Sequence, residues 1–178
     1  MNRRLRPVLT AVAIFVSAII GAAVLGMLLP RRHVAATSAI VHRPVNEVWM
    51  AISDIASQPS WRSDLKEVQL LPSHDGQAVW LQETGTGNWP LEFTEVVAPT
   101  RLVASVADSS QGFGGSWTYE LTPDPGGTRI KITERGFIDS PLFRFLAQFV
   151  FGLRGAQETF LRDLGRHFGE TVTPHAED

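Results

Sequence analysis

The chain has 178 residues, of which 44% are apolar, and it contains no cysteine. Five of its 16 lysine and arginine residues and none of its 18 acidic residues lie in the first 32 positions, so the remainder carries a net charge of about −7. An acidic domain repels nucleic acid phosphates, and the absence of cysteine excludes disulfides, thiol catalysis and cysteine-ligated metals. The length suffices for one domain with a hydrophobic core.

Residues 7–29 form an apolar run without a single charge, PVLTAVAIFVSAIIGAAVLGMLL. As a helix this run spans about 34 Å, enough to cross a hydrocarbon core of roughly 30 Å. The competing interpretation is a cleaved signal peptide, whose apolar region usually has only about 7–15 residues. We therefore expect a single-pass N-terminal transmembrane helix, with residues 1–6 as a basic flank and residues 30–34 as a linker.

The arginines around this run favour one orientation in the membrane. Three of them and the amino terminus precede the run, whereas Arg31 and Arg32 follow it directly. The positive-inside rule then favours a soluble domain outside the cytoplasm. Small residues at positions 21–23 and 26 either allow two such helices to pack closely or reflect the ordinary composition of membrane helices.

The soluble part opens with a short strand and two short helices. Residues 36–41 (ATSAIV) are typical of a strand. Pro44 suits the first position of a helix, and Asp54 is a candidate N-cap for a second short helix that ends near Pro59. The first helix carries an apolar stripe of Val45, Val48, Trp49 and Ile52.

Six strand-like segments follow, each ended by turn residues, and consecutive strands with short turns form an antiparallel meander. They are residues 66–71, 78–83, 89–97, 101–107, 115–122 and 128–135. The glycine-rich residues 112–115 are a candidate lid over a pocket. They are not a phosphate loop, because they lead into a strand and no Lys-Ser/Thr follows.

The C-terminal segment predicts one long helix. Ser140 is its candidate N-cap and Pro141 its first residue, and apolar residues recur at spacings of three and four up to Phe168. Gly152 and Gly155 are candidate bend points. The first turns are apolar on more than one face, which indicates contact with a ligand, a bilayer or a second subunit, or burial under loops. A curved antiparallel sheet of about seven strands around this helix is an α+β fold.

Six short motifs of the soluble part carry a family resemblance: residues 40–49 (IVHRPVNEVW), 52–54 (ISD), 59–61 (PSW), 93–96 (FTEV), 115–122 (GSWTYELT) and 132–134 (ITE). They resemble the START-like (SRPBCC) superfamily of helix-grip proteins, in its bacterial polyketide cyclase/dehydrase-like branch. The resemblance covers residues 35–170 and leaves residues 171–178 as a tail. It implies a cavity between the sheet and the C-terminal helix that holds a hydrophobic small molecule or a lipid. Some members of the superfamily catalyse cyclisation or dehydration.

Strand alternation places candidate carboxylates on the inner face of the sheet. Glu134 is in phase with Ile130 and Ile132, which makes it a candidate acid or polar anchor. Glu83 and Tyr119 are the further candidates for acid–base chemistry. The alternative for each carboxylate is an ordinary structural ion pair.

Other side chains compete for the site or line it. Glu95 follows Leu91 and Phe93 in phase, whereas Arg62 and Asp64 are expected to form a surface pair. The histidines show no metal-ligand spacing, so we predict neither a metal nor a cofactor. Plain core packing is the alternative for the aromatic residues. The candidate ligand-binding residues are Trp61, Trp80, Leu91, Phe93, Trp117, Tyr119, Glu134, Phe145 and Phe149.

The predicted function is membrane-anchored binding of a hydrophobic small molecule or lipid, with residues 7–29 as the anchor and no nucleic acid partner. Two alternatives stay open. One is a cyclase or dehydratase-type enzyme that uses an inward Glu134. The other is a non-catalytic scaffold that binds a partner through its last helix.

Overall fold

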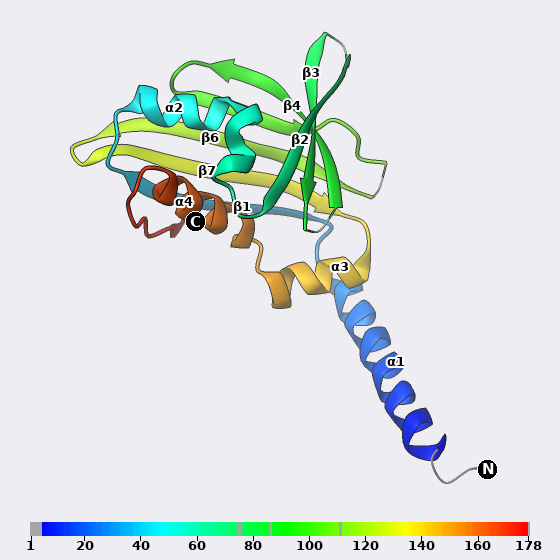
Figure 1. Cartoon of the computed structure of the whole chain (residues 1–178). Helices are drawn as coiled ribbons and strands as arrows, with labels where there is room; N and C mark the ends of the chain where they lie inside the picture. Colours follow the sequence, from blue (N-terminus) through cyan, green and yellow to red (C-terminus); the bar gives the residue numbers. More distant parts are fainter. Residues whose placement is uncertain (1–4, 75, 86, 111, 178) are drawn as a thin grey trace.

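The computed structural model describes residues 5–74, 76–85, 87–110 and 112–177 (Figure 1). The predicted basic flank lies largely outside the described residues, as does Asp178 of the predicted tail. Helix α1 (Leu5–Leu28) extends away from the rest of the molecule (Figure 1). Its segment Val8–Leu28 is long and apolar enough to cross a membrane, a property that signal sequences share.

The remaining helices and strands form one sheet with its helical cover. Element η1 is a 3₁₀-helix and η2 is a π-helix. In chain order the elements are β1 (Arg32–Val41), α2 (Val45–Ser53), η1 (Ile55–Ser60), β2 (Leu65–His74), β3 (Gln77–Thr84), β4 (Gly87–Val97), β5 (Arg101–Val106), β6 (Phe113–Asp124), β7 (Gly127–Ile138), α3 (Pro141–Leu146), η2 (Ala147–Phe151), α4 (Gly155–His167) and β8 (His175–Glu177).

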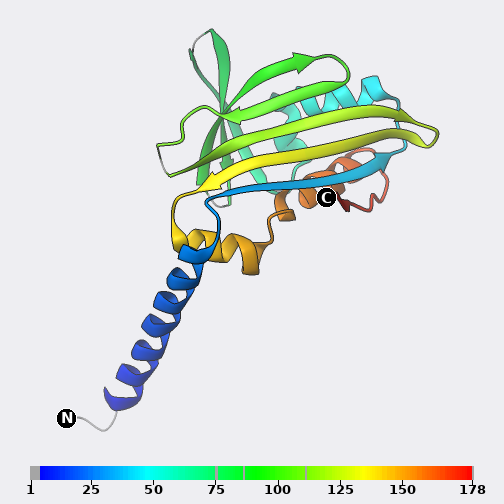
Figure 2. The ribbon, with the colours of Figure 1, turned by 180° about the vertical axis from the view of Figure 1, so that it is seen from behind.

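The sheet has the order β2-β3-β4-β5-β6-β7-β1-β8, and neighbouring strands are antiparallel. This confirms the expected meander and the α+β class. The eighth strand, β8, pairs with β1 and lies in the predicted tail. Views from opposite sides show that α2, η1 and α4 all lie on one face of the sheet, and that no helix of the described residues covers the other face (Figures 1 and 2).

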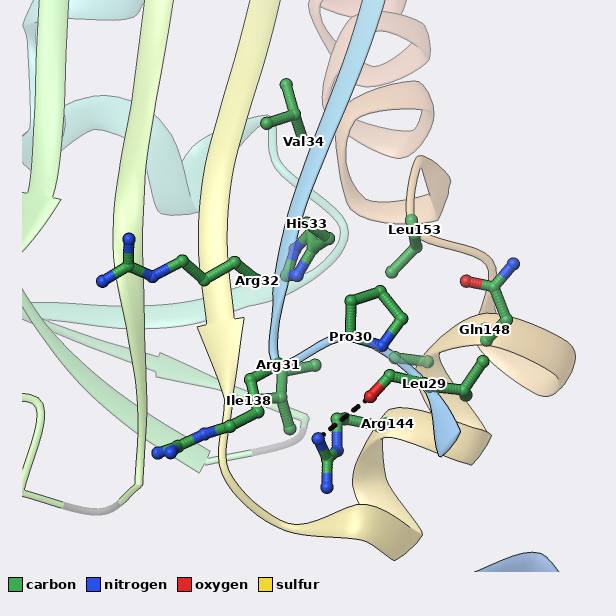
Figure 3. A pocket seen from close by; sticks show the side chains of 11 residues that line it. Leu29, Pro30, Arg31, Arg32, His33, Val34, Ile138, Arg144, Gln148 and Leu153 are labelled. Carbon is green, nitrogen blue, oxygen red and sulfur yellow. Dashed lines mark hydrogen bonds between the residues drawn. The ribbon is translucent and has the colours of Figure 1, made fainter. Parts of the chain in front are cut away.

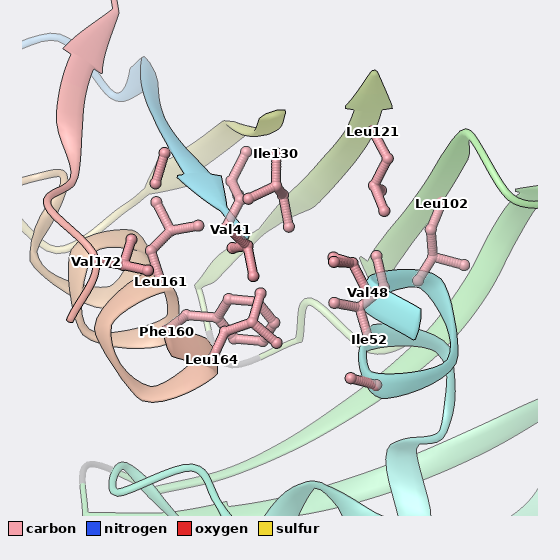
Figure 4. Close-up of a cluster of buried hydrophobic side chains, with 13 residues drawn as sticks. Val41, Val48, Ile52, Leu102, Leu121, Ile130, Phe160, Leu161, Leu164 and Val172 are labelled. Carbon is pink, nitrogen blue, oxygen red and sulfur yellow. The ribbon is translucent and has the colours of Figure 1, made fainter. Parts of the chain in front are cut away.

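The core lies where α2 and α4 meet the central strands (Figure 4). Alternation along β7 turns Thr128, Ile130 and Ile132 inward, and all three are almost completely buried. Helix α2 buries its predicted apolar stripe at Val48 and Ile52. The core cluster also includes Val41, Leu102, Leu121, Phe160, Leu161, Leu164 and Val172.

Of the two N-caps predicted from the sequence, Ser140 caps its helix and Asp54 does not. The Ser140 hydroxyl accepts a hydrogen bond from the Phe143 amide, so the predicted cap of α3 is confirmed. Asp54 does precede η1, but its side chain makes no capping hydrogen bond.

The candidate lid at 112–115 was wrong, because Phe113–Gly115 belong to β6 and pair with β7.

The predicted single C-terminal helix is broken. Gly152 has φ of +75°, a conformation that side-chain-bearing residues rarely adopt, and it separates α3 and η2 from α4. Helix α3 packs against α1 instead of the sheet, so closely that a Cβ atom at Gly26 would lie 1.8 Å from the Pro141 carbonyl oxygen. Gly26 of α1 therefore serves a contact within the chain, and of the C-terminal helical elements only α4 packs into the core beside α2.

This break predicts different outcomes for two neighbouring glycines. Gly152→Ala should lower the melting temperature of the full chain in detergent micelles by about 3 °C, because the new Cβ strains a positive-φ backbone. Gly155→Ala is the control: it begins α4 without a positive φ, and neither glycine has another group within 4 Å of the added Cβ. Equal melting temperatures for both variants would contradict the proposed role of Gly152.

Candidate functional site

A cavity of about 900 Å³ lies between the inner face of the sheet and the helical elements η1, η2 and α4. This volume is in the range of small-molecule sites. Most of its lining is apolar, and strands β4 to β6 contribute a large share of these apolar and aromatic residues: Trp89, Leu91, Phe93, Leu102, Ala104, Phe113, Trp117 and Tyr119.

A charged pair forms part of the cavity wall. The guanidinium group of Arg62 donates to both carboxylate oxygens of Asp64, at 3.1 and 2.6 Å, and to the Gln58 side chain at 2.9 Å. It also lies 5.3 Å from the ring centre of Phe160, and its side chain is only 11% exposed. The expected pair between Arg62 and Asp64 is confirmed, but it lies in the cavity wall and not on the open surface, because Arg62 packs against Phe160 of α4.

Asp163 of α4 holds this segment in place. Its Oδ2 accepts hydrogen bonds from the backbone amide and the hydroxyl of Ser63, at 2.6 and 2.8 Å. The Asp163 side chain is buried, and a buried carboxylate is stable only when such donors satisfy it. The contact therefore positions Arg62 and Asp64 at the cavity wall.

Tyr119 supplies a phenol to the cavity. Its ring lies 5.4 Å from that of Phe160. Burial raises the pKa of Tyr119 to about 12; the Arg62 charge acts in the opposite direction, and the carboxylates of Asp64 and Glu134 reinforce the rise. The hydroxyl is therefore protonated at neutral pH and can donate a hydrogen bond to a ligand.

Glu134 shares the inner face with Ile132, as expected, but it does not line the cavity. One oxygen accepts from His33 Nε2 at 3.0 Å. The other accepts from Trp117 Nε1 at 3.0 Å and from Gln157 Nε2 at 3.4 Å. Trp117 and Gln157 both line the cavity, so Glu134 positions two residues of the wall without lining the cavity itself.

The other candidate carboxylates face away from the cavity. Gln82 and Thr84 line it, which leaves Glu83 on the opposite face, 3.6 Å from Lys66 Nζ. A bulge between Phe93 and Glu95 reverses the alternation of β4, so Glu95 turns outward and binds Arg101. The expectation that Glu83 and Glu95 point inward was wrong.

Four of the predicted ligand-binding residues line the cavity: Leu91, Phe93, Trp117 and Tyr119. Trp61 does not, since it packs between the rings of Phe160 and His167. Trp80 pairs with Leu91 across the sheet but is not part of the cavity wall.

The two predicted helix residues lie outside the cavity as well. The rings of Phe145 and Phe149 contact each other at 5.0 Å, and Phe149 is exposed. The next residues of η2, Val150 and Phe151, line the cavity in their place. The cavity-lining positions thus differ from those predicted for one continuous helix, which is broken at Gly152.

Sequence reasoning missed Gln157, which is 2% exposed and lines the cavity. Its Nε2 donates to the Ala35 carbonyl at 3.1 Å and to Glu134, whereas its Oε1 has no partner among the described residues. A usable signal existed: Gln157 lies three and four residues before Phe160 and Leu161, as a polar interruption of a buried stripe. Within the described ranges, no group of three or more His, Asp or Glu side chains is arranged to hold a metal.

The family described as "Polyketide cyclase / dehydrase and lipid transport" matches residues 32–169, which include every wall of the cavity. The chain belongs to this family. The resemblance drawn from the sequence is thereby confirmed. A search of the curated proteins finds no match.

Solved structures agree with this assignment at the level of the fold. The di-domain ARO/CYC protein StfQ of the steffimycin pathway matches with a TM-score of 0.61 and 10% identity, over 75% of this chain and 49% of its own. A Rhodobacter sphaeroides protein matches at 0.55 and 17%, over 76% and 92%. The di-domain ARO/CYC protein BexL of the BE-7585A pathway matches at 0.54 and 14%, over 92% and 55%. The chain thus spans about half of each di-domain protein.

The raised pKa of Tyr119 can be measured directly, because it is the only tyrosine of the chain. We expect the ultraviolet absorbance of tyrosinate to appear with a midpoint near pH 12. A protonated phenol is favoured by the fold, so this contribution to stability is present below about pH 10 and is lost as the pH rises through 12. A midpoint near that of free tyrosine would show that water reaches the hydroxyl.

Glu134→Gln should destabilise the protein by about 2 kcal/mol, because an NH2 group replaces one carboxylate oxygen and the hydrogen bonds to a charged acceptor are lost. The measurement is thermal unfolding of the full chain in detergent micelles. Glu120→Gln is the control, since Glu120 is exposed and paired with Arg101 at the surface. A Glu134→Gln protein as stable as the control would contradict the positioning role.

Proposed function

We propose that this protein is a membrane-anchored binding protein for a hydrophobic small molecule or a lipid. The observation that carries the proposal is the 900 Å³ cavity with its largely apolar wall. Burial of a ligand's apolar surface there provides the driving force for binding. A cavity of this size also argues against a scaffold whose interior is filled by side chains.

The polar groups of the wall favour a ligand with a small number of polar atoms. The Tyr119 hydroxyl offers a donor, and the unpartnered Oε1 of Gln157 offers an acceptor. Asp64 neutralises Arg62, and Glu83 lies 3.6 Å from Lys66, so the charged groups of the wall are paired. We infer that the polar end of the ligand is an uncharged hydroxyl, carbonyl or amide.

Helix α1 is proposed to be the anchor. Its apolar segment has the length of a membrane span, and the arginine distribution favours the cavity-bearing domain outside the cytoplasm. A ligand of this apolar kind is abundant in the bilayer to which the anchor would hold the domain.

A cyclase or dehydratase-type reaction is the second candidate function. It is favoured by the position of Tyr119 beside the Arg62–Asp64 pair in the wall, and by the family to which the chain belongs. Glu134 does not line the cavity, so Tyr119 is the group that would touch a substrate and donate a hydrogen bond to its carbonyl oxygen. In that case Tyr119→Phe would abolish turnover and retain binding of the apolar part.

Ala104→Phe tests the binding proposal by filling the cavity. Ala104 lies on the inner face of β5 and lines the cavity, so the added ring should weaken binding of a fluorescent fatty alcohol at least about tenfold. The measurement is equilibrium titration of the full chain in nanodiscs. Ala176→Phe is the matched control, because Ala176 lies exposed on the edge strand β8.

The two variants separate cavity binding from nonspecific adsorption. Loss of binding in Ala104→Phe with retention in Ala176→Phe supports the proposal. Equal binding by both variants and the unchanged protein would show that the probe binds elsewhere and would contradict it.

A further inference from the structure

The segment formed by α3 and η2 presents an unusual apolar surface. Phe143, Phe149, Val150 and Phe151 each leave 61–65% of their area exposed. Arg144 is the one charged residue of the segment, and it does not belong to this surface: its Nη1 donates to the Leu29 carbonyl at 3.0 Å (Figure 3). Exposed apolar surface of this kind marks an interaction site.

Contacts at the junction fix this segment to the end of α1. Gly26 lies directly against the Pro141 backbone, and Arg144 binds the last carbonyl of the apolar run at Leu29. Arg31, which follows α1, forms an ion pair with Asp139, which precedes α3. A small cavity of about 150 Å³ lies between these elements (Figure 3). The segment therefore keeps its position relative to α1.

The cavity reaches the same end of the molecule. Val150 and Phe151 are exposed and also line the cavity, together with Thr84 at the end of β3 and Gly85 after it. In Figure 1 the end of β3 and the α3–η2 segment both lie at the end of the domain nearest α1. The wall of the cavity and the exposed apolar surface thus share residues.

We propose that the α3–η2 segment lies in the membrane interface and that the cavity opens there onto lipid. This inference rests on the proposed role of α1 as a membrane anchor. A lipid bilayer is the occupant that fits the surface, because α1 would place the bilayer directly beneath α3 and because the exposed face carries no charge. An apolar ligand would then pass from the bilayer into the cavity without crossing water.

Single labels can measure the depth of each helix, because the chain has no cysteine of its own. Phe143→Cys and Phe149→Cys place a fluorescent label on the exposed face without touching the cavity. Val16→Cys reports on the middle of α1, and Met50→Cys on α2 is the matched control with similar exposure. Each labelled full chain is reconstituted into vesicles of brominated phosphatidylcholine, which quenches only labels in the hydrocarbon region.

Quenching at positions 16, 143 and 149, with none at 50, is the expected result. Quenching at 16 alone would overturn the interface position and leave the anchor intact. No quenching at 16 would contradict the anchor itself, and the present inference with it. The labels at 143 and 149 could instead escape quenching to a degree that rises with protein concentration. That result would assign the surface to a second copy of the chain and overturn the proposal.

The path by which a ligand enters the cavity can be tested by comparing the rates of its uptake from vesicles and from water. Phe149→Asp places a charge on the exposed face and should slow the uptake of a fluorescent fatty alcohol from phosphatidylcholine vesicles about tenfold. Uptake of the same probe added from aqueous solution should be unchanged, and Met50→Asp should match the unchanged protein in both assays. Equal rates from vesicles for Phe149→Asp and Met50→Asp would overturn the direct opening onto lipid.

Discussion

The conformation of Gly152 is the constraint on which the rest of this structure depends. If the C-terminal helix continued past that residue, its apolar side chains would extend along the sheet beyond the core. With φ of +75° the helix ends, and only its last part, α4, covers the core together with α2. The space beyond α4 is the cavity, and the preceding turns of helix are directed to α1. One backbone angle thus separates the core, the candidate site and the junction with the N-terminal helix.

Two carboxylates, the buried Asp163 and the partly buried Glu134, stabilise the site from outside its wall. Glu134 accepts hydrogen bonds from His33, Trp117 and Gln157. Asp163 accepts hydrogen bonds from the backbone amide and the hydroxyl of Ser63. Each carboxylate fixes residues that face the cavity without facing it itself. A polar group with this many partners is costly to lose and has little freedom to act on a ligand. Its position explains why the inner face of a strand is not sufficient to identify a site residue.

The N-terminal helix and the cavity are connected through α3. The α3–η2 segment contacts α1 through Pro141 at its start and lines the cavity through Val150 and Phe151 at its end. A binding domain held by a flexible linker would meet the membrane in many orientations. Here Arg144, Asp139 and the close Gly26–Pro141 contact join the domain directly to α1 and the residues that follow it. This rigid connection distinguishes the proposed function from that of a freely tethered domain.

The sequence by itself determined the elements whose signal is local. Strand alternation, turn residues and the charge-free run of residues 7–29 predicted the meander, the order of elements and the apolar N-terminal helix. The motifs around positions 40–49 and 115–122 indicated the family. Only the tertiary structure decided the site. A bulge in β4 turned Glu95 outward, Glu134 met three donors from distant elements, and Arg62 folded back against Phe160. These outcomes depend on contacts between residues far apart in the chain, which local periodicity does not encode.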